Sequence, residues 1–337
     1  MIGYSGSLQG SAGISAFKLG TKPGGAFSYT IVNNAGFVDL QVDALSDVWS
    51  GAQSTEWSTN TIAGSKNWKQ SGSPKDYANG DDVLFDDSAT GTTTVDLSVA
   101  DVTPASVTFA NVGSNYTLQG SAAIAGNIGL TKPGAGTVAI NNANKFTGAV
   151  TVSAGTLAAG NIANKGINSA LGAGTNISLG GATLSYTGGT ASSDRPIAMT
   201  AGSTIDVSSG ATSLSLTGAI SGSFALTKTG SGTMVLQNAA NSYGATTING
   251  GVVSVADNLA LGSTGPLNFG GGTLALTGSS AFSSAKSVSL NTGGGTIQVD
   301  NTTGATFSAA VTGSGGLTKT GTNTLTLSSA SSSSSGV

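Results

Sequence analysis

Short runs in which apolar residues alternate with small or hydroxylated residues recur along most of this chain. In GTMVL, residues 232–236, Met234 and Leu236 fall on one face of an extended segment and Val235 on the other, because side chains alternate along a strand. The pattern small–Thr–apolar–x–apolar has its threonine at residues 137, 156, 183, 204, 233, 273, 296 and 324, and Val252 takes that place once. No window has a persuasive 3.6-residue apolar period, so the pattern predicts strands and essentially no helix.

A longer period contains this short one. The phrase LTK begins at Leu130, Leu226 and Leu317, which are 96 and 91 residues apart. Other segments match in the same order: 144–157 with 241–253, 169–188 with 259–278, and 202–207 with 294–299. The threonine positions are 19 to 29 residues apart, about 23 on average, so four short units make one long repeat.

A unit of this length cannot bury an apolar face alone, whereas stacked units can. Three short strands per turn, with equivalent positions stacked at ~4.8 Å, give a continuous ladder core. The sequence therefore predicts an all-β chain folded as a parallel, right-handed β-helix or solenoid. Nine units would form a rod of roughly 40 Å. The alternative is an antiparallel β-sandwich array, which predicts hairpins with two-residue turns.

The phrase LTKTG is interpreted as a corner of the coil. Its leucine enters the core, its lysine points to solvent, and its glycine turns the chain into the next strand. Lys132, Lys228 and Lys319 would then occupy equivalent corners about four rungs apart. We expect solvated turn lysines here, and a lysine-lined binding face is the alternative.

The composition changes near residue 107. Residues 1–107 hold 11 acids, 5 lysines and all three tryptophans, whereas residues 108–337 hold 4 acids and 7 bases. We divide the chain into a β-hairpin-containing N-terminal segment or end of a preceding unit (1–45), a Trp- and Asp-containing module (46–107), solenoid repeats (108–329) and a Ser-rich tail (330–337). Residues 26–42 predict a hairpin around 33–36.

The low charge narrows the possible functions. Only 8% of residues are charged, the net charge is −3, and no basic run suggests nucleic acid. The absence of cysteine excludes a disulfide framework, and no apolar run reaches the ~18 residues of a membrane helix. Without histidine and cysteine, most catalytic triads and zinc sites are excluded. We expect no catalytic residue, no cofactor and no metal.

Three groups of residues could nevertheless carry chemistry. Asp81, Asp82, Asp86 and Asp87 are hard oxygen ligands that could bind calcium. We interpret them as solvated strand ends and leave calcium open. The only arginine, Arg195, is expected to pair with Asp194 or to cover a turn.

The third group comprises the three tryptophans, Trp49, Trp57 and Trp68. Aromatic faces of this kind either stack on sugars in an adhesin or pack inside a cap over the first coil. We expect packing in a cap.

The repeated phrases also resemble a known family. The series G-x-L-T-K-x-G-x-G-T-L-x-L, then N-x-[YF]-T-G, then T-[IV]-x-x-G-x-L resembles the autotransporter-associated β-strand repeat over about residues 108–330, most clearly at 130–157 and 226–253. Residues 49–87 resemble the module that often precedes such repeats, with W-x-G…W…NW…DGD-x-V-x-F-D as its pattern. The resemblance implies export, a β-helical stalk and a structural or adhesive role on a bacterial surface.

Neither a signal peptide nor a C-terminal translocator barrel is recognised in the sequence, so we expect a fragment or a processed piece. The expected function is that of an extracellular structural module, a rigid stalk or fibre segment. Its expected partners are further copies of itself, associated head to tail through the strand edge after Leu327, or the continuation of a larger surface protein. A glycan- or host-binding adhesin is the alternative, and a polysaccharide-acting enzyme fragment is the third hypothesis.

Overall fold

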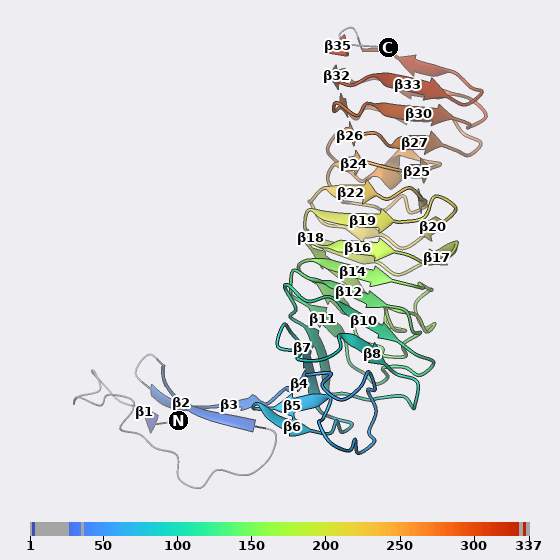
Figure 1. The fold of residues 1–337 in the computed structure, drawn as a ribbon. Coiled ribbons are helices and arrows are strands. Elements are labelled where there is room, and N and C mark those ends of the chain that lie inside the picture. The colour runs from blue at the N-terminus through green and yellow to red at the C-terminus, as the bar shows by residue number, and fades with distance from the viewer. Residues whose placement is uncertain (1, 4–26, 35–36, 330–332, 335–337) are drawn as a thin grey trace.

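The computed structural model describes residues 2–3, 27–34, 37–329 and 333–334, and most of them wind into a long β-solenoid (Figure 1). Strands of successive turns pair in parallel, so the predicted solenoid is confirmed and the antiparallel sandwich is wrong. The described residues contain a single short 3₁₀ helix, η2 (Asn258–Leu261). None of their helices is long and apolar enough to cross a membrane.

Each turn of the coil passes over three faces, which we number in the order in which the chain crosses them. The second face carries the longest sheet, with twelve strands. In chain order they are β8 (Thr94–Asp96), β10 (Tyr116–Gln119), β12 (Thr137–Ile140), β14 (Thr156–Ala159), β16 (Thr183–Tyr186), β19 (Ser203–Val207), β22 (Leu226–Thr229), β24 (Thr246–Ile248), β26 (Leu267–Phe269), β29 (Val288–Leu290), β32 (Val311–Gly313) and β35 (Ser333–Ser334).

The first face carries a ten-stranded sheet over the N-terminal half of the coil. Its strands are β4 (Asp47–Trp49), β5 (Trp68–Gln70), β6 (Ser73–Lys75), β7 (Asp82–Phe85), β9 (Ser106–Phe109), β11 (Leu130–Lys132), β13 (Val150–Val152), β15 (Ile177–Gly180), β18 (Ile197–Ala201) and β21 (Ile220–Ser221). By its place in the chain, a three-stranded sheet continues this face near the C-terminal end. It consists of β28 (Phe282–Ser284), β31 (Ala305–Phe307) and β34 (Leu325–Leu327).

The third face carries a seven-stranded sheet over the C-terminal half. Its strands are β17 (Ala191–Ser193), β20 (Ser213–Leu216), β23 (Thr233–Leu236), β25 (Val252–Val255), β27 (Thr273–Leu276), β30 (Gly295–Val299) and β33 (Leu317–Thr320). Closer to the N-terminal end, isolated bridges such as Val102 with Ile124 mark this side of the coil.

Twelve stacked strands on the second face correspond to eleven turns and, at ~4.8 Å per rung, to a rod of about 53 Å. The expectation of nine units was too short because the counted threonines begin at Thr137, which leaves out the turns that carry β8 and β10. Paired residues on this face are separated by 19 residues in the shortest turn and 27 in the longest.

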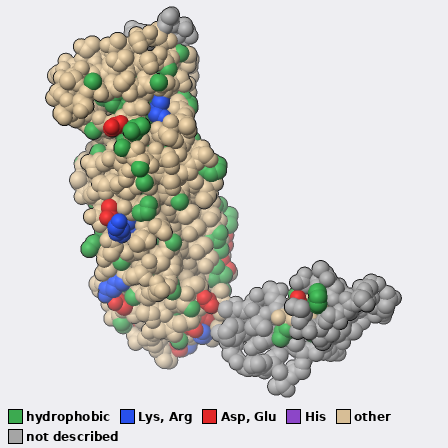
Figure 2. Space-filling model, turned by 180° about the vertical axis from the view of Figure 1, so that it is seen from behind, with side chains coloured by type: hydrophobic (Ala, Val, Ile, Leu, Met, Phe, Trp, Pro, Cys, Tyr) green, Lys and Arg blue, Asp and Glu red, His purple; other side chains and the backbone are tan. Residues whose placement is uncertain are grey.

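The core is made of columns of inward side chains that repeat from turn to turn. Along the second face, Tyr116, Val138, Leu157, Leu184 and Ile205 are successive partners, and each is at most 2% exposed. The outward positions between them carry mainly threonine, serine and alanine. Figure 2 shows the result: the surface in view is largely uncharged, with charged side chains in a few small groups.

The N-terminal end of the coil is closed by an antiparallel element. Strand β4 pairs in parallel with β7 on one side and antiparallel with β5 on the other, and β5 pairs antiparallel with β6. Residues 55–57 cover the edge of β8 with two backbone hydrogen bonds: Asp96 N–H donates to Thr55 at 2.6 Å, and Trp57 N–H donates to Asp96 at 2.9 Å.

A hairpin precedes this cap. β2 (Phe27–Asn34) and β3 (Phe37–Ala44) pair antiparallel with Asn34 opposite Phe37, which confirms the predicted hairpin, and β1 (Ile2–Gly3) pairs with β3. Figure 1 shows the hairpin projecting to the side of the cap. The division of the chain at residues 45, 107 and 329 stays a prediction, and most of the predicted tail lies outside the described residues.

Candidate functional site

The three tryptophans pack together inside the cap. Trp49, Trp57 and Trp68 are 0, 0 and 1% exposed. The ring centroid of Trp57 lies 5.3 Å from that of Trp68, 5.6 Å from that of Tyr77 and 5.5 Å from that of Phe85. The predicted packing in a cap is confirmed. None of these indole rings has a free face on which a sugar could stack.

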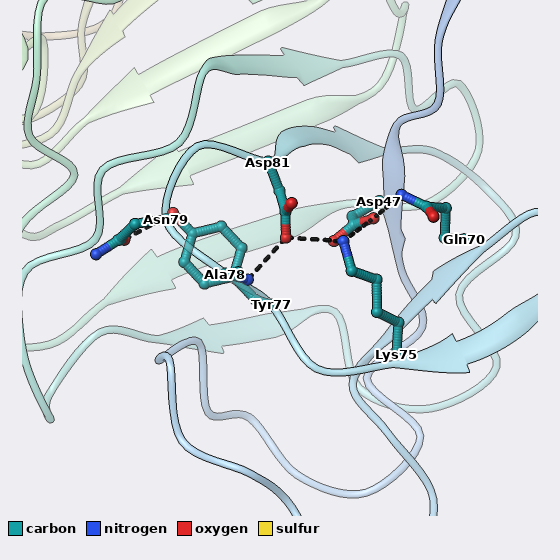
Figure 3. A network of polar contacts seen from close by, with 7 residues as sticks. All are labelled: Asp47, Gln70, Lys75, Tyr77, Ala78, Asn79 and Asp81. Carbon is teal, nitrogen blue, oxygen red and sulfur yellow. Dashed lines mark hydrogen bonds and ion pairs between the residues drawn. The ribbon is translucent and has the colours of Figure 1, made fainter. Parts of the chain in front are cut away.

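A network of charges around the buried carboxylate of Asp47 lies where the cap meets the coil (Figure 3). The Lys75 ammonium nitrogen is 2.8 Å from Oδ2 of Asp47 and 2.9 Å from Oδ2 of Asp81. Gln70 donates to Oδ1 of Asp47 at 3.0 Å, and the Ala78 N–H donates to Asp81 at 2.7 Å. The network joins β4, β6 and the turn before β7.

These contacts move the three pKa values apart. Burial raises the pKa of Asp47 to about 6, and the neighbouring Asp81 adds to the rise while Lys75 opposes it. Burial also acts to raise the pKa of Asp81, but hydrogen bonds from Lys75 and Ala78 hold it below its usual value. For Lys75, burial favours a lower pKa, and the two carboxylates outweigh it and raise the pKa. Lys75 therefore binds two carboxyl groups whose pKa values are shifted in opposite directions, up for Asp47 and down for Asp81.

The four clustered acids do not converge. Asp81 belongs to the network above, Asp82 accepts the hydroxyl of Ser106 from the next turn, and Asp86 accepts the N–H and the hydroxyl of Ser88 at 2.8 and 2.6 Å. Within the described part of the chain, no three acidic, histidine or cysteine side chains form a group that could hold a metal ion. The expectation that this segment binds no calcium stays a prediction.

Asp87, the fourth acid, binds backbone. Its Oδ1 accepts the N–H groups of Val112, Gly113 and Ser114, at 3.1, 3.1 and 2.8 Å. These hydrogen bonds, that of Ser114 first, hold the pKa of Asp87 below its usual value. The carboxylate thus ties the turn after β7 to the corresponding turn of the next rung.

The expectation that the repeat lysines point to solvent is wrong for Lys132 and Lys228, which are both 0% exposed. Strand alternation explains the error: Leu130 and Lys132 are two residues apart, so the leucine that enters the core carries the lysine inward with it. On the second face Lys228 occupies a core position between Ile205 and Ile248.

Lys132 uses its charge to bind carbonyl groups at the corner. Its ammonium donates to the carbonyl of Gly134 at 2.6 Å and to that of Ala154, in the next turn, at 3.4 Å. Burial lowers the pKa of Lys132 to about 8. The side chain thus packs its aliphatic part in the core and ties two turns together with its head group.

Lys228 repeats this arrangement. Its ammonium donates to the carbonyls of Thr229, of Gly230 at 3.0 Å and, in the next turn, of Gly250 at 3.4 Å. Burial lowers the pKa of Lys228 to about 8, against the opposing charge of Asp206. In the third copy of the phrase, Lys319 donates to Gly321 at 2.7 Å and is exposed.

The glycine of the phrase is required by space. A Cβ atom there would lie 2.1, 2.3 and 2.4 Å from a carbonyl oxygen of the preceding turn when added to Gly134, Gly230 and Gly321 respectively. Gly230 and Gly321 also have positive φ angles, of 74° and 81°, which side chains disfavour. The phrase therefore recurs because one small corner needs leucine, lysine and glycine together.

Sequence reasoning missed a pair of buried asparagines. Oδ1 of Asn144 accepts the N–H of Ile124 in the preceding turn at 2.9 Å, and Nδ2 donates to the carbonyl of Ala170 in the following turn at 3.2 Å. Asn241 makes the same two bonds in the second repeat, at 2.8 Å each. The signal was present, because these residues open the matched N-x-[YF] motif, but their role needed the turns on both sides.

Arg195 is buried and does not pair with Asp194, which lies 3.8 Å from Lys165 instead. Its Nη1 donates to the carbonyl of Leu171 at 2.8 Å, so of the two expectations the ion pair is wrong and a role at a turn is confirmed. Burial lowers the pKa of Arg195, against the charge of Asp194.

The second repeat has a lysine where the first has Arg195. Arg195 precedes Ile197 of β18 by two residues, and Lys286 precedes Val288 of β29 by two. Lys286 borders an open hollow of about 400 Å³ together with Asn258, residues 263–266, Ala285 and Ser287. Its pKa is lowered by partial burial.

Comparison with known proteins agrees with these repeats. The Passenger-associated-transport-repeat family matches residues 130–159, 226–255 and 317–337. A curated relative, the adhesin BmaC autotransporter of Brucella suis biovar 1 (strain 1330), is 36% identical over 217 residues, which is 58% of this chain and 6% of the relative. The chain thus spans only a small part of the length of that relative. No solved structure matches.

The family matches begin at Leu130, Leu226 and Leu317, at the residues where the three LTK phrases begin, and the first two end with β14 and β25. The first two matches contain the buried lysine, the obligatory glycine and the asparagine that joins neighbouring turns. The chain therefore carries passenger-associated-transport repeats, the repeats of autotransporter passenger segments, folded as a β-solenoid.

Proposed function

We propose that this chain is a rigid stalk or fibre segment of a bacterial surface protein, exposed outside the cell. The observation that carries the proposal is the unbroken parallel pairing of twelve strands along the second face. A coil in which each turn is bonded to the next along its whole length cannot bend without breaking rungs. The surface in view is largely uncharged, which suits a spacer.

The size of the relative supports a place within a longer protein. This chain matches 6% of an autotransporter adhesin, so the remaining length of such a protein offers room for further stalk and for binding parts. We propose that the chain is continued by further turns, with β33 and β34 as the strands on which they stack. Both strands lack a further partner strand among the described residues.

Head-to-tail association of separate copies is the second way to cover that edge. The bare coil cannot stack on itself, because β5, β6 and residues 55–57 close its N-terminal end. The hairpin β2–β3 remains as a donor, because the outer edge of β2 has no partner among the described residues and free edges recruit strands. A contact of this kind, which does not close on itself, would build a fibre.

Small-angle X-ray scattering combined with sedimentation velocity tests these proposals. A stalk segment predicts a rod-shaped particle with a solenoid of about 53 Å at every protein concentration. Head-to-tail association predicts particles whose length grows with concentration, and deletion of residues 1–45 should abolish that growth. A flexible, bent particle would contradict the stalk.

A glycan- or host-binding adhesin is the alternative, and the similarity to an autotransporter adhesin favours it. Because the three tryptophans are buried, such binding would use other residues, and the hollow of about 400 Å³ beside Lys286 is one candidate. A glycan array with the intact chain tests this alternative, with a Lys286→Ala variant as the matched control. We propose no catalytic role, because the buried acids serve the fold.

A further inference from the structure

The three copies of the LTK phrase lie on three different faces of the coil. The first copy is β11 on the first face, the second is β22 on the second face, and the third is β33 on the third face. The strands that follow them are displaced in the same way, as β12, β23 and β34. The lysines were expected at equivalent corners about four rungs apart, but their corners lie on three different faces, so the alternative of a lysine-lined face is wrong.

Counting along the faces shows why. From Leu130 the first face continues through the paired residues Val150, Ile177, Ile197 and Ile220, which completes four turns, and the chain then reaches Leu226 on the next face. The second repeat does the same. From Leu226 the second face continues through its paired residues at positions 246, 267, 288 and 311, and the chain then reaches Leu317 on the third face.

We propose that the long repeat is the unit of length of this rod. Each repeat advances the coil by four turns and then by one further face, so successive repeats are related by a screw rotation. Adding a repeat would lengthen the rod by about 21 Å at ~4.8 Å per rung and rotate everything beyond it by one third of a turn. The biological meaning of this unit rests on the proposed stalk function, whereas its geometry does not.

The corners explain why a repeat can move from face to face. The lysine and the glycine of the phrase occur on all three faces, in β11, β22 and β33 and the turns after them. The lysine is buried in β11 and β22, and at all three glycines a Cβ would collide with a carbonyl oxygen of the preceding turn. In this corner the ammonium groups of Lys132 and Lys228 donate to backbone carbonyl groups, which every face provides. The same phrase therefore fits the coil on any of the three faces.

The last turn shows which partner fits its open edge. Lys132 and Lys228 each reach a carbonyl of the following turn, whereas the described residues offer Lys319 only its own corner, at Gly321. Leu325 and Leu327 are half-buried, although their equivalents in the first two repeats are at most 1% exposed. A further copy of the repeat, beginning on the next face, would supply these contacts.

The screw also distributes surface features around the rod. The basic corner position lies between the third and first faces at Arg195, and between the first and second faces at Lys286. A partner that recognises one repeat from one side would meet the next copy of its site on another side. Binding to successive repeats would therefore wind around the stalk.

Deletion of residues 130–225 tests the screw, and the cysteine-free chain permits a disulfide readout. The deletion joins Gly129 to Leu226, so the second repeat must take the place of the first. Thr108 is the partner of Thr131 on the first face, and Thr227 is the equivalent of Thr131. Cysteines at 108 and 227 should then be one rung apart, within the Cα distance that a disulfide spans.

The matched control places cysteines at 117 and 229 in the same deletion. Thr117 lies on the second face, in the row of paired residues at 139, 158, 185 and 206 that also contains Thr229 in the intact chain. We expect the 108–227 disulfide to form and the 117–229 disulfide not to form. The opposite result would mean that the repeat keeps its face, and it would overturn the screw.

An insertion keeps the proposal testable if the deletion fails to fold. A second copy of residues 226–316 placed after residue 316 removes no native contact upstream. We expect a melting temperature no lower than that of the parent and a particle about 21 Å longer by X-ray scattering. A loss of folding, or an unchanged length with a disordered insert, would contradict the proposal. If the screw geometry is right but the chain is not a stalk, the 108–227 disulfide would form and the insertion would lengthen the particle. The scattering and sedimentation tests of the proposed function would then still fail.

Discussion

The two ends of the solenoid differ in how their edges are covered. The N-terminal end has an antiparallel strand pair, a cluster of three tryptophans and a partly buried network of Asp47, Lys75 and Asp81. The repeats contain none of these. They hold each turn with the turns above and below it, through the same lysine, glycine and asparagine positions, and their last described turn stays partly open.

This difference teaches where the chain needs unique residues. A repeat turn shares its core with two neighbours of similar sequence, so its stability is spread over many equivalent contacts. The cap has a neighbour on one side only and must bury its outer surface with side chains that occur once. Single substitutions in the cap should therefore act more strongly than those at ordinary repeat positions, and exceptions should be the inward lysine and the corner glycine.

The largest effect is expected for Trp57→Ala. The ring is fully buried against Trp68, Tyr77 and Phe85, and removal of a buried aromatic side chain costs about 3–5 kcal/mol. Denaturant unfolding followed by circular dichroism would measure this loss. The control is Val99→Ala at a position that is 54% exposed, where a change of about 0.5 kcal/mol or less is expected. Similar losses for both variants would contradict the role of the tryptophans as a cap.

The next effect separates two lysines of the same phrase. Lys228→Glu places a carboxylate among carbonyl oxygens in the core and should cost several kcal/mol, whereas Lys319→Glu at the exposed last turn should cost about 0.5 kcal/mol or less. Thermal melting of both variants decides the question. Equal losses would show that the last turn is as closed as the inner ones.

The lysines also show what the sequence could and could not predict. Alternation and the repeated phrases were enough for the strands, the parallel solenoid and the N-terminal hairpin, because each depends on a local period. The same alternation places Lys228 inward, two residues after Leu226, but its charge suggested solvent. Aliphatic packing and the carbonyl groups of the corner outweighed the cost of burying it.

Other features depend on distances that the sequence does not contain. The shift of each repeat by one face was hidden because turns vary from 19 to 27 residues on the second face, so 96 and 91 residues both look like four turns. The cap network joins Asp47, Lys75 and Asp81 from three separate segments without any period. Only the fold brings these residues together.

A pair of glycines compares the turns of the two regions. Gly72, in the cap hairpin, and Gly230, in a repeat corner, have φ angles of 80° and 74°. Alanine at either position should cost about 1 kcal/mol of backbone strain. At Gly230 its Cβ would also lie 2.3 Å from the carbonyl oxygen of Val207, whereas nothing lies within 4 Å at Gly72. Melting temperatures should therefore fall further for Gly230→Ala, and the reverse order would refute the tight corner.

The stability of the repeats and the stability of the cap should change with pH in opposite directions. Lys132 and Lys228 have a pKa of about 8 in the folded chain and about 10.4 when unfolded, so the unfolded chain binds more protons between these values. Stability should rise from pH 8 to about 10, by on the order of 2 kcal/mol for the pair. The double variant Lys132→Met and Lys228→Met should lose this rise in denaturant melts. A rise that persists would assign it to other groups.

The smallest effect is expected from Asp47 in the cap, and its sign is opposite. Its pKa is about 6 in the folded chain and about 3.9 when unfolded, so the folded chain binds more protons between pH 4 and 6. Its contribution to stability is therefore present below pH 4 and is lost as the pH rises to 6, by about 1 kcal/mol after the opposing contribution of Asp81. Asp47→Asn should flatten this decline when melting temperatures are measured at pH 4, 5 and 6.

The matched control is Asp101→Asn. Asp101 forms a partly exposed ion pair with Lys145 at 2.6 Å, which holds the pKa of Asp101 below its usual value. This carboxylate stays charged in both states above pH 5, so its removal should leave most of the decline between pH 4 and 6 in place. If Asp101→Asn flattened the profile as much as Asp47→Asn, the buried cap network would not be the source of the pH response. The contrast between a cap that loses stability toward pH 6 and repeats that gain it above pH 8 would then not hold.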